Sequence, residues 1–275
     1  MARLFEADDY ILVNVLLLFL LINFNLEIGT IYGLMAIVDW IAYYIALDKS
    51  AITLFPIEKD KRNRMINIAW AMGAYVAFIF VVNFIVVRLN VAPSSTLSPF
   101  EYVSQLISGT FSASPILYGS RFLKVIVWGL LIPIIETRFF FRTLLQWGQK
   151  SAGFKYTSFF TIQTLLLSVF FGAVFTVFHI VAKGITNNSS LLVTFIFGAV
   201  STALVLYFRE AIQAIFLHII TNTIATMQQL GIGFFTDGLR INSSGVLILA
   251  GILLATWMLL FQELPLINVI GGISK

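Results

Sequence analysis

The sequence has no cysteine, only two histidines and few charged residues in a chain of 275 residues. Without cysteine, the chain has no disulfide, no thiolate nucleophile and no cysteine ligand for a metal. Charged residues make up 11% of the chain and hydrophobic residues 59%, a balance that a soluble domain of this length does not tolerate. The scarcity of charge predicts an integral membrane protein and argues against a nucleic-acid partner, although the net charge is +4.

Long apolar runs fill most of the chain. A membrane-spanning helix needs about 20 mostly apolar residues, and the sequence contains roughly eight such segments. They lie near residues 8–24, 28–47, 66–88, 122–146, 158–182, 191–208, 211–229 and 246–262. The stretch 102–118 is too polar to span and is expected to lie at the interface or to re-enter. No linker or repeat divides the chain, so we predict one domain, residues 1–275, of an all-α polytopic membrane protein.

The positive charges predict how these helices are oriented, because short cytoplasmic loops retain lysine and arginine. With the N-terminus inside, twelve of the 17 basic residues fall on the inner side and five on the outer side. The inner set includes Arg3, Lys275 and the cluster of basic residues between 49 and 64. We therefore expect a multi-pass protein with both termini in the cytoplasm.

Both histidines and one glutamate lie within the apolar segments, where an ionisable group is costly unless the protein uses it. Glu136 follows Pro133 by three residues, and the proline is expected to bend the helix beside a candidate proton acceptor. His218 and Asn222 are four residues apart and therefore share one helix face. Both side chains donate hydrogen bonds, as an oxyanion hole requires. His179 lies in the pattern Phe-x-x-x-His near the end of another helix.

In order along the chain, Pro-x-x-Glu ends at Glu136, Phe-x-x-x-His ends at His179 and His-x-x-x-Asn spans 218–222. This ordered set resembles the CAAX prenyl protease and bacteriocin-processing family (CPBP, also called Abi) of glutamate intramembrane proteases. The resemblance covers residues 122–229 and implies that they form a four-helix catalytic core. The N-terminal helices and loops, 1–121, and the C-terminal helix and tail, 230–275, match nothing specific.

The resemblance implies a role for each motif residue. Glu136 would be the general base, and His179 would help it to activate a water molecule. His218 and Asn222 would stabilise the oxyanion, so that a peptide bond is hydrolysed without a metal, a cofactor or a covalent intermediate. The implied partners are membrane lipid and a peptide or protein substrate at or in the membrane. In the eukaryotic branch of the family that substrate is a prenylated CAAX tail, whereas many prokaryotic members have other substrates.

The first motif departs from the family pattern Glu-Glu-x-x-x-Arg. Thr137 stands at the second glutamate, and Phe141 stands at the arginine, with Arg138 and Arg142 nearby. One residue turns a side chain by about 100° on an α-helix, so Arg142 is not expected to replace the family arginine. The catalytic glutamate is retained, and its supporting groups differ.

Distances along straight helices set a condition on this site. At about 1.5 Å per residue, Glu136 lies roughly 15 Å, and His218 roughly 12 Å, from the inner ends of their helices. His179 lies roughly 31 Å from the start of its own helix, near the outer face. The residues converge only if that helix is strongly tilted, starts deeper than residue 158 or is irregular in its first part.

Other functions fit the same residues. A transporter could relay protons through Glu136, the histidines and Asp39, although no internal repeat or pair of broken helices is present. A non-catalytic binding or immunity protein could keep the fold, which the altered first motif favours. Glu136, His179 and His218 could also ligate zinc, without the usual His-Glu-x-x-His spacing.

The plainest alternative is that these polar residues only pack helices together. An intramembrane histidine such as His179, or Asn222 alone, often forms an interhelical hydrogen bond. Glu136 could pair with Arg138 or Arg142 near the interface. Asp39, another acid in an apolar segment, is most simply explained by structural pairing.

Overall fold

The computed structural model describes residue 16 and residues 61–88, 99–108, 121–145, 161–183, 185–208, 211–232, 235–236 and 240–260. The first two predicted spans, apart from Leu16, and Asp39 lie outside the described residues. The remaining six predicted spans each fall on a helical segment. The prediction of an all-helical fold is confirmed for the described part of the chain, in which the one β-sheet is a pair of two-residue strands.

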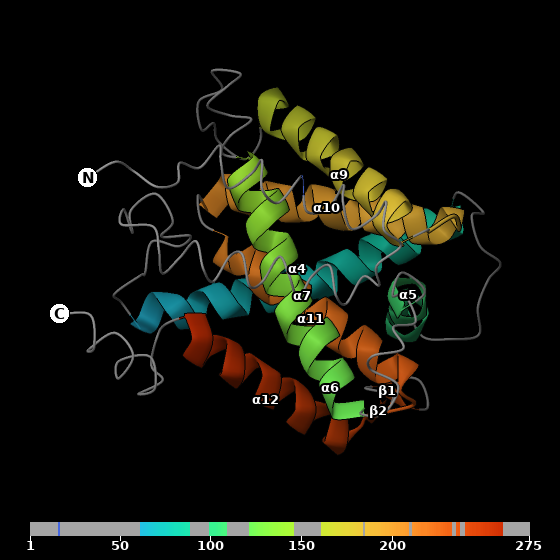
Figure 1. Cartoon of the computed structure of the whole chain (residues 1–275), viewed down its shortest axis with the longest axis vertical. Coiled ribbons are helices and arrows are strands. Elements are labelled where there is room, and N and C mark those ends of the chain that lie inside the picture. The colour runs from blue at the N-terminus through green and yellow to red at the C-terminus, as the bar shows by residue number, and fades with distance from the viewer. Residues whose placement is uncertain are drawn as a thin grey trace.

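The described helices are shown in Figure 1. They are α4 (Lys61–Arg88), α5 (Pro99–Ser108), α6 (Arg121–Ile126), η2 (Val127–Leu131), α7 (Ile132–Glu136), η3 (Thr137–Leu144), α9 (Ile162–Lys183), α10 (Asn188–Phe208), α11 (Ile212–Gln229) and α12 (Ser243–Leu260). The strands β1 (Phe235–Thr236) and β2 (Arg240–Ile241) pair antiparallel between α11 and α12.

Two of the described helices are long and apolar enough to cross a membrane, by length and composition: α9, over Ile162–Val181, and α10. Shorter apolar stretches occur at Ala69–Ile85 in α4 and Ser243–Thr256 in α12. Large apolar side chains of α9, such as Leu165, Leu166 and Phe170, are exposed. A row of exposed apolar side chains along an apolar helix is what a lipid environment accommodates.

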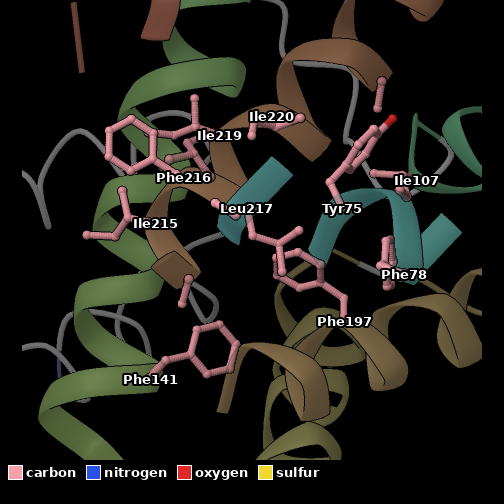
Figure 2. Close-up of a cluster of buried hydrophobic side chains, with 14 of the residues drawn as sticks. Tyr75, Phe78, Ile107, Phe141, Phe197, Ile215, Phe216, Leu217, Ile219 and Ile220 are labelled. Atoms are coloured by element: carbon pink, nitrogen blue, oxygen red, sulfur yellow. The ribbon is translucent and has the colours of Figure 1, made fainter. Parts of the chain in front are cut away.

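Helix α11 lies at the centre of the described helices. Every residue from 211 to 227 is buried, because α11 contacts α4, α5, α10, α12 and the helical run 121–145. Figure 2 shows side chains of α11, including Leu217 and Ile220, among those contributed by α4 and α10. Polar side chains on a helix buried all round must find their partners inside the protein.

Helices α9 and α10 approach each other backbone to backbone. A Cβ atom added at Gly198 would lie 3.0 Å from the Cα of Gly172 and 3.0 Å from the Cβ of Phe175. A Cβ atom at Gly172 would lie 2.9 Å from the carbonyl oxygen of Phe195. Small residues allow helices in membranes to pack this closely. The contact fixes Phe175, which faces the candidate site.

The run 121–145 is a continuous helix that contains two π-helical segments, η2 and η3, on either side of the α-helical turn α7. Pro133 lies near the start of α7, and proline removes a backbone donor from a helix. At η2, the Thr223 hydroxyl of α11 donates to the carbonyl of Gly129 at 3.2 Å. π-Helical turns occur frequently at functional sites, and here Glu136 and Thr137 lie where α7 passes into η3.

Candidate functional site

Glu136 is the last residue of α7, and its side chain is buried, with 1% of the residue exposed. Thr137, the next residue, begins η3 and is fully buried. The backbone N–H of Thr137 donates to the carbonyls of Ile134 and Pro133. A carboxyl group and a hydroxyl group on consecutive residues therefore face the protein interior.

The imidazole ring of His218, on α11, lies close to the Glu136 carboxyl group and the Thr137 hydroxyl group. Its Nε2 atom lies 3.4 Å from Oε2 of Glu136, and its Nδ1 atom lies 3.0 Å from Oγ1 of Thr137. Hydrogen bonds between nitrogen and oxygen are usually 2.7–3.2 Å long, so the Thr137 contact is a hydrogen bond and the Glu136 contact is longer than this range. The two ring nitrogens are thus placed against residues 81 and 82 positions away in the sequence.

His179 lies near the end of α9 and is buried. Its Nδ1 atom lies 2.8 Å from the backbone oxygen of Phe175. A carbonyl oxygen only accepts hydrogen bonds, so Nδ1 carries the proton. In the neutral ring, Nε2 of His179 is then an acceptor, which can receive a hydrogen bond from a water molecule or a polar group of a substrate.

Phe175 connects the two histidines. Its ring centroid lies 4.2 Å from that of His179 and 6.1 Å from that of His218, so the two imidazole rings are no more than about 10 Å apart. The helix α9 begins at Ile162, four residues after the predicted start at 158. Phe175 thus brings the rings of His179 and His218 into one neighbourhood.

Aromatic rings surround the site on the side of α10. Phe197 lies 4.7 Å from His218, ring to ring. Phe141, which stands at the family's arginine position, is fully buried and lies 5.0 Å from Phe175 and 6.4 Å from Phe197. Figure 2 shows Phe141 and Phe197 with the neighbouring core side chains. Apolar surroundings lower the local dielectric constant and strengthen the electrostatic interactions of Glu136 and His218.

Asn222 lies one helical turn beyond His218 on α11 and is buried. Its neighbours point elsewhere: the hydroxyl of Thr221 donates to the carbonyl of Leu217 at 2.7 Å, and that of Thr223 donates to Gly129. The four-residue spacing keeps Asn222 on the face of α11 that carries His218.

The π-helical segment changes one argument made from the sequence. The rotation of about 100° per residue applies to an α-helix, whereas Thr137–Leu144 is π-helical and turns less per residue. The rotation of about 100° therefore does not apply between position 141, where the family has its arginine, and Arg142. The side chains of Arg138 and Arg142 lie outside the described part of the structure.

Sequence reasoning missed two contributors to this site. Thr137 stands out in the sequence as a departure from the motif beside Glu136, but its contact with His218 was not predicted. Phe197 carries no signal in the sequence, because it is one of 27 phenylalanines in a chain where apolar runs are everywhere. Only the packing of α10 against α11 places it on His218.

Within the described residues, no three histidine, cysteine, aspartate or glutamate side chains gather in a way that could hold a metal ion. The zinc hypothesis draws no support from this part of the chain. Comparison with protein-family models, with curated proteins and with solved structures finds no match to this chain. The resemblance to glutamate intramembrane proteases therefore rests on the motif residues alone.

Proposed function

We propose that the chain is a metal-independent intramembrane endopeptidase of the glutamate type, similar to the CPBP family. The observation that carries this proposal is the buried contact of Glu136 with His218, at 3.4 Å between Oε2 and Nε2. It brings the first and third motifs together in an aromatic environment. The second motif lies beside them, because Phe175 contacts both histidine rings.

The proposal includes a polytopic arrangement of about eight spans, each of roughly 20 residues, with both termini in the cytoplasm. The catalytic core would consist of the run 121–145, α9, α10 and α11. Support comes from the apolar character of α9 and α10. Further support comes from large apolar side chains exposed on other helices, among them Trp70, Phe80 and Phe84 of α4 and Leu247 and Leu254 of α12.

In the proposed reaction, the Glu136 carboxylate accepts a proton from a water molecule whose oxygen attacks the peptide carbonyl carbon. Nε2 of His179 is oriented as an acceptor that can hold the second hydrogen of this water. The negative charge that develops on the carbonyl oxygen is stabilised by N–H donors of His218 and Asn222. The proton held by Glu136 then passes to the leaving nitrogen as the C–N bond breaks, giving a carboxylic acid and an amine.

The substrate would be a peptide or protein segment that reaches the site from the membrane. Membrane lipid is the second partner, and the proposal includes no nucleic acid. Processing of a lipidated C-terminus, as in the CAAX branch of the family, is one form of this activity. A substrate with an apolar anchor would reach a site surrounded by phenylalanine rings more readily than a soluble peptide.

The test is peptide cleavage by the full-length protein reconstituted in lipid, with a chelator present. Glu136→Gln keeps the shape of the side chain and removes the base, so we expect cleavage to fall by about 100-fold or more. Glu101→Gln, the same change on α5, serves as the matched control and is expected to cleave normally. Cleavage that stops with chelator and returns with zinc would contradict the glutamate mechanism.

A second candidate is a non-catalytic binding or immunity protein. It is favoured by Phe141, since an arginine position of the family is filled here by a buried aromatic ring. Well-folded protein that cleaves no peptide of a library presented in lipid vesicles, yet retains one of them, would favour this candidate. A transporter, in contrast, would move protons across the membrane. Vesicles that contain the protein and a pH-sensitive dye would then change their internal pH.

A further inference from the structure

We propose that Thr137 is a positioning residue that selects the tautomer of His218. The Thr137 hydroxyl donates to Nδ1, so that the ring proton resides on Nε2, which faces Glu136. The role of this arrangement in hydrolysis rests on the proposed function. The tautomer can be measured whether or not the protein is a protease.

The first observation behind this proposal is the pair of hydrogen-bonding groups around His218. A neutral imidazole has one N–H donor and one acceptor nitrogen. Nε2 lies 3.4 Å from Oε2 of Glu136. As the carboxylate base of the proposed function, Glu136 can only accept, so the proton belongs on Nε2. Nδ1 must then accept, and the hydroxyl 3.0 Å away, on Thr137, is a group that can donate to it.

The second observation is the direction of the Thr137 hydroxyl. Threonine in a helix commonly bonds back to the carbonyl four residues earlier. Several described helical threonines do this at 2.7–2.8 Å, namely Thr176, Thr194, Thr202, Thr221 and Thr256. The Thr137 hydroxyl instead reaches across to α11. The carbonyl four residues before it, that of Pro133, accepts the backbone N–H of Thr137.

The consequence for chemistry follows from the tautomer. An oxyanion needs a donor, and Nε2 of His218 is a donor only while the proton stays there. In other sites, a third group that hydrogen-bonds the far nitrogen of a histidine sets which nitrogen is protonated. Thr137, whose hydroxyl can donate to Nδ1, therefore suits a donating Nε2.

The experiment uses nitrogen-15 NMR of the full-length protein in lipid, labelled on histidine. The chain has only two histidines, so the spectrum contains four ring nitrogens, and His179→Gln assigns them. We expect the proton of His218 on Nε2 in the wild type and in Thr137→Ser. In Thr137→Val, which keeps the branched shape without the hydroxyl, we expect the tautomer ratio to shift by about fivefold towards Nδ1–H, the effect of losing one buried hydrogen bond.

Thr202→Val is the matched control, because it removes a hydroxyl that donates to Gly198 in its own helix, α10, at 2.8 Å. It should leave the His218 signals unchanged. The inference is overturned if His218 carries its proton on Nδ1 in the wild type, or if Thr137→Val folds and shows the wild-type ratio.

Peptide cleavage then separates the two proposals. In an active enzyme, Thr137→Val should lower kcat by about fivefold with KM unchanged, while Thr137→Ser stays within about twofold, as expected for one hydrogen bond. An inactive wild type with the expected tautomer shift counts against the proposed function and leaves the Thr137 inference standing. Normal kcat in Thr137→Val with a shifted ratio overturns the catalytic role of the positioning.

Discussion

The close contact of α9 and α10 predicts that alanine is destabilising at the glycines between them. The methyl group of Gly198→Ala would lie 3.0 Å from the Cα of Gly172 and 3.0 Å from the Cβ of Phe175, and that of Gly172→Ala would lie 2.9 Å from the Phe195 carbonyl oxygen. These neighbours are backbone atoms or atoms bonded to the backbone, so the helices must move apart.

Two effects of opposite sign decide the magnitude. Alanine is favoured over glycine inside a helix by about 1 kcal/mol. Overpacking of a tight contact usually costs about 1–3 kcal/mol. Here no flexible side-chain end can yield, so we expect a cost of about 2–3 kcal/mol. We therefore expect the free energy of unfolding to fall by about 1–2 kcal/mol for Gly198→Ala and for Gly172→Ala.

Gly73→Ala in α4 and Gly251→Ala in α12 are the matched controls. A Cβ atom added at either position meets nothing within 4 Å, so only the helix preference acts and stability should stay the same or rise. The assay is unfolding in lipid bicelles followed by circular dichroism. Equal effects of Gly198→Ala and Gly251→Ala would refute the reasoning, because they would show that the contact between α9 and α10 is not tight.

Two further substitutions on α11 separate catalysis from packing. Asn222→Ala removes a donor proposed to stabilise the oxyanion, and we expect kcat for peptide cleavage to fall by about 100-fold with KM little changed; an unchanged kcat would exclude Asn222 from the oxyanion hole. Thr223→Val removes the hydroxyl that donates to Gly129 at 3.2 Å and should lower the free energy of unfolding by about 1 kcal/mol, measured by the same unfolding assay. Wild-type stability of Thr223→Val would mean that this hydrogen bond does not hold α11 against η2.

The helices were predictable because their apolar runs are long and their ends are polar. The segment predicted at 211–229 is α11, Ile212–Gln229. Helices α10 and α12 each begin three residues before the predicted starts, 191 and 246. In both, an asparagine side chain accepts backbone N–H groups of the first turn: Asn187 from Ser189 at 2.9 Å, and Asn242 from Ser244 at 3.0 Å. Asparagine and serine are preferred at the N-terminal ends of helices. A prediction from apolar residues alone therefore placed the starts of α10 and α12 too far along the chain.

The π-helical segments were not predictable from the pattern of apolar residues. The run 122–146 was treated as one α-helix, and Pro133 was expected only to bend it. The structure has π-helical turns before and after α7, which changes the direction of every side chain after Glu136. Thr137 therefore reaches His218, and Phe141 packs among Phe175 and Phe197. Contacts between residues 81 positions apart depend on this local irregularity, which hydrophobic spacing does not encode.

The two contacts of His218 differ in length, and this difference matters for the proposed function. A histidine that only joins helices gains most when both of its nitrogens make short hydrogen bonds, because a poorly paired buried polar group is costly. Here the Thr137 contact is 3.0 Å and the Glu136 contact is 3.4 Å, so the Nδ1 contact is the shorter of the two. Catalytic hydrogen bonds are often long in the free enzyme and shorten when a substrate binds. In the proposed mechanism, the longer contact is the one that His218 gives up when it turns its N–H from Glu136 to an oxyanion.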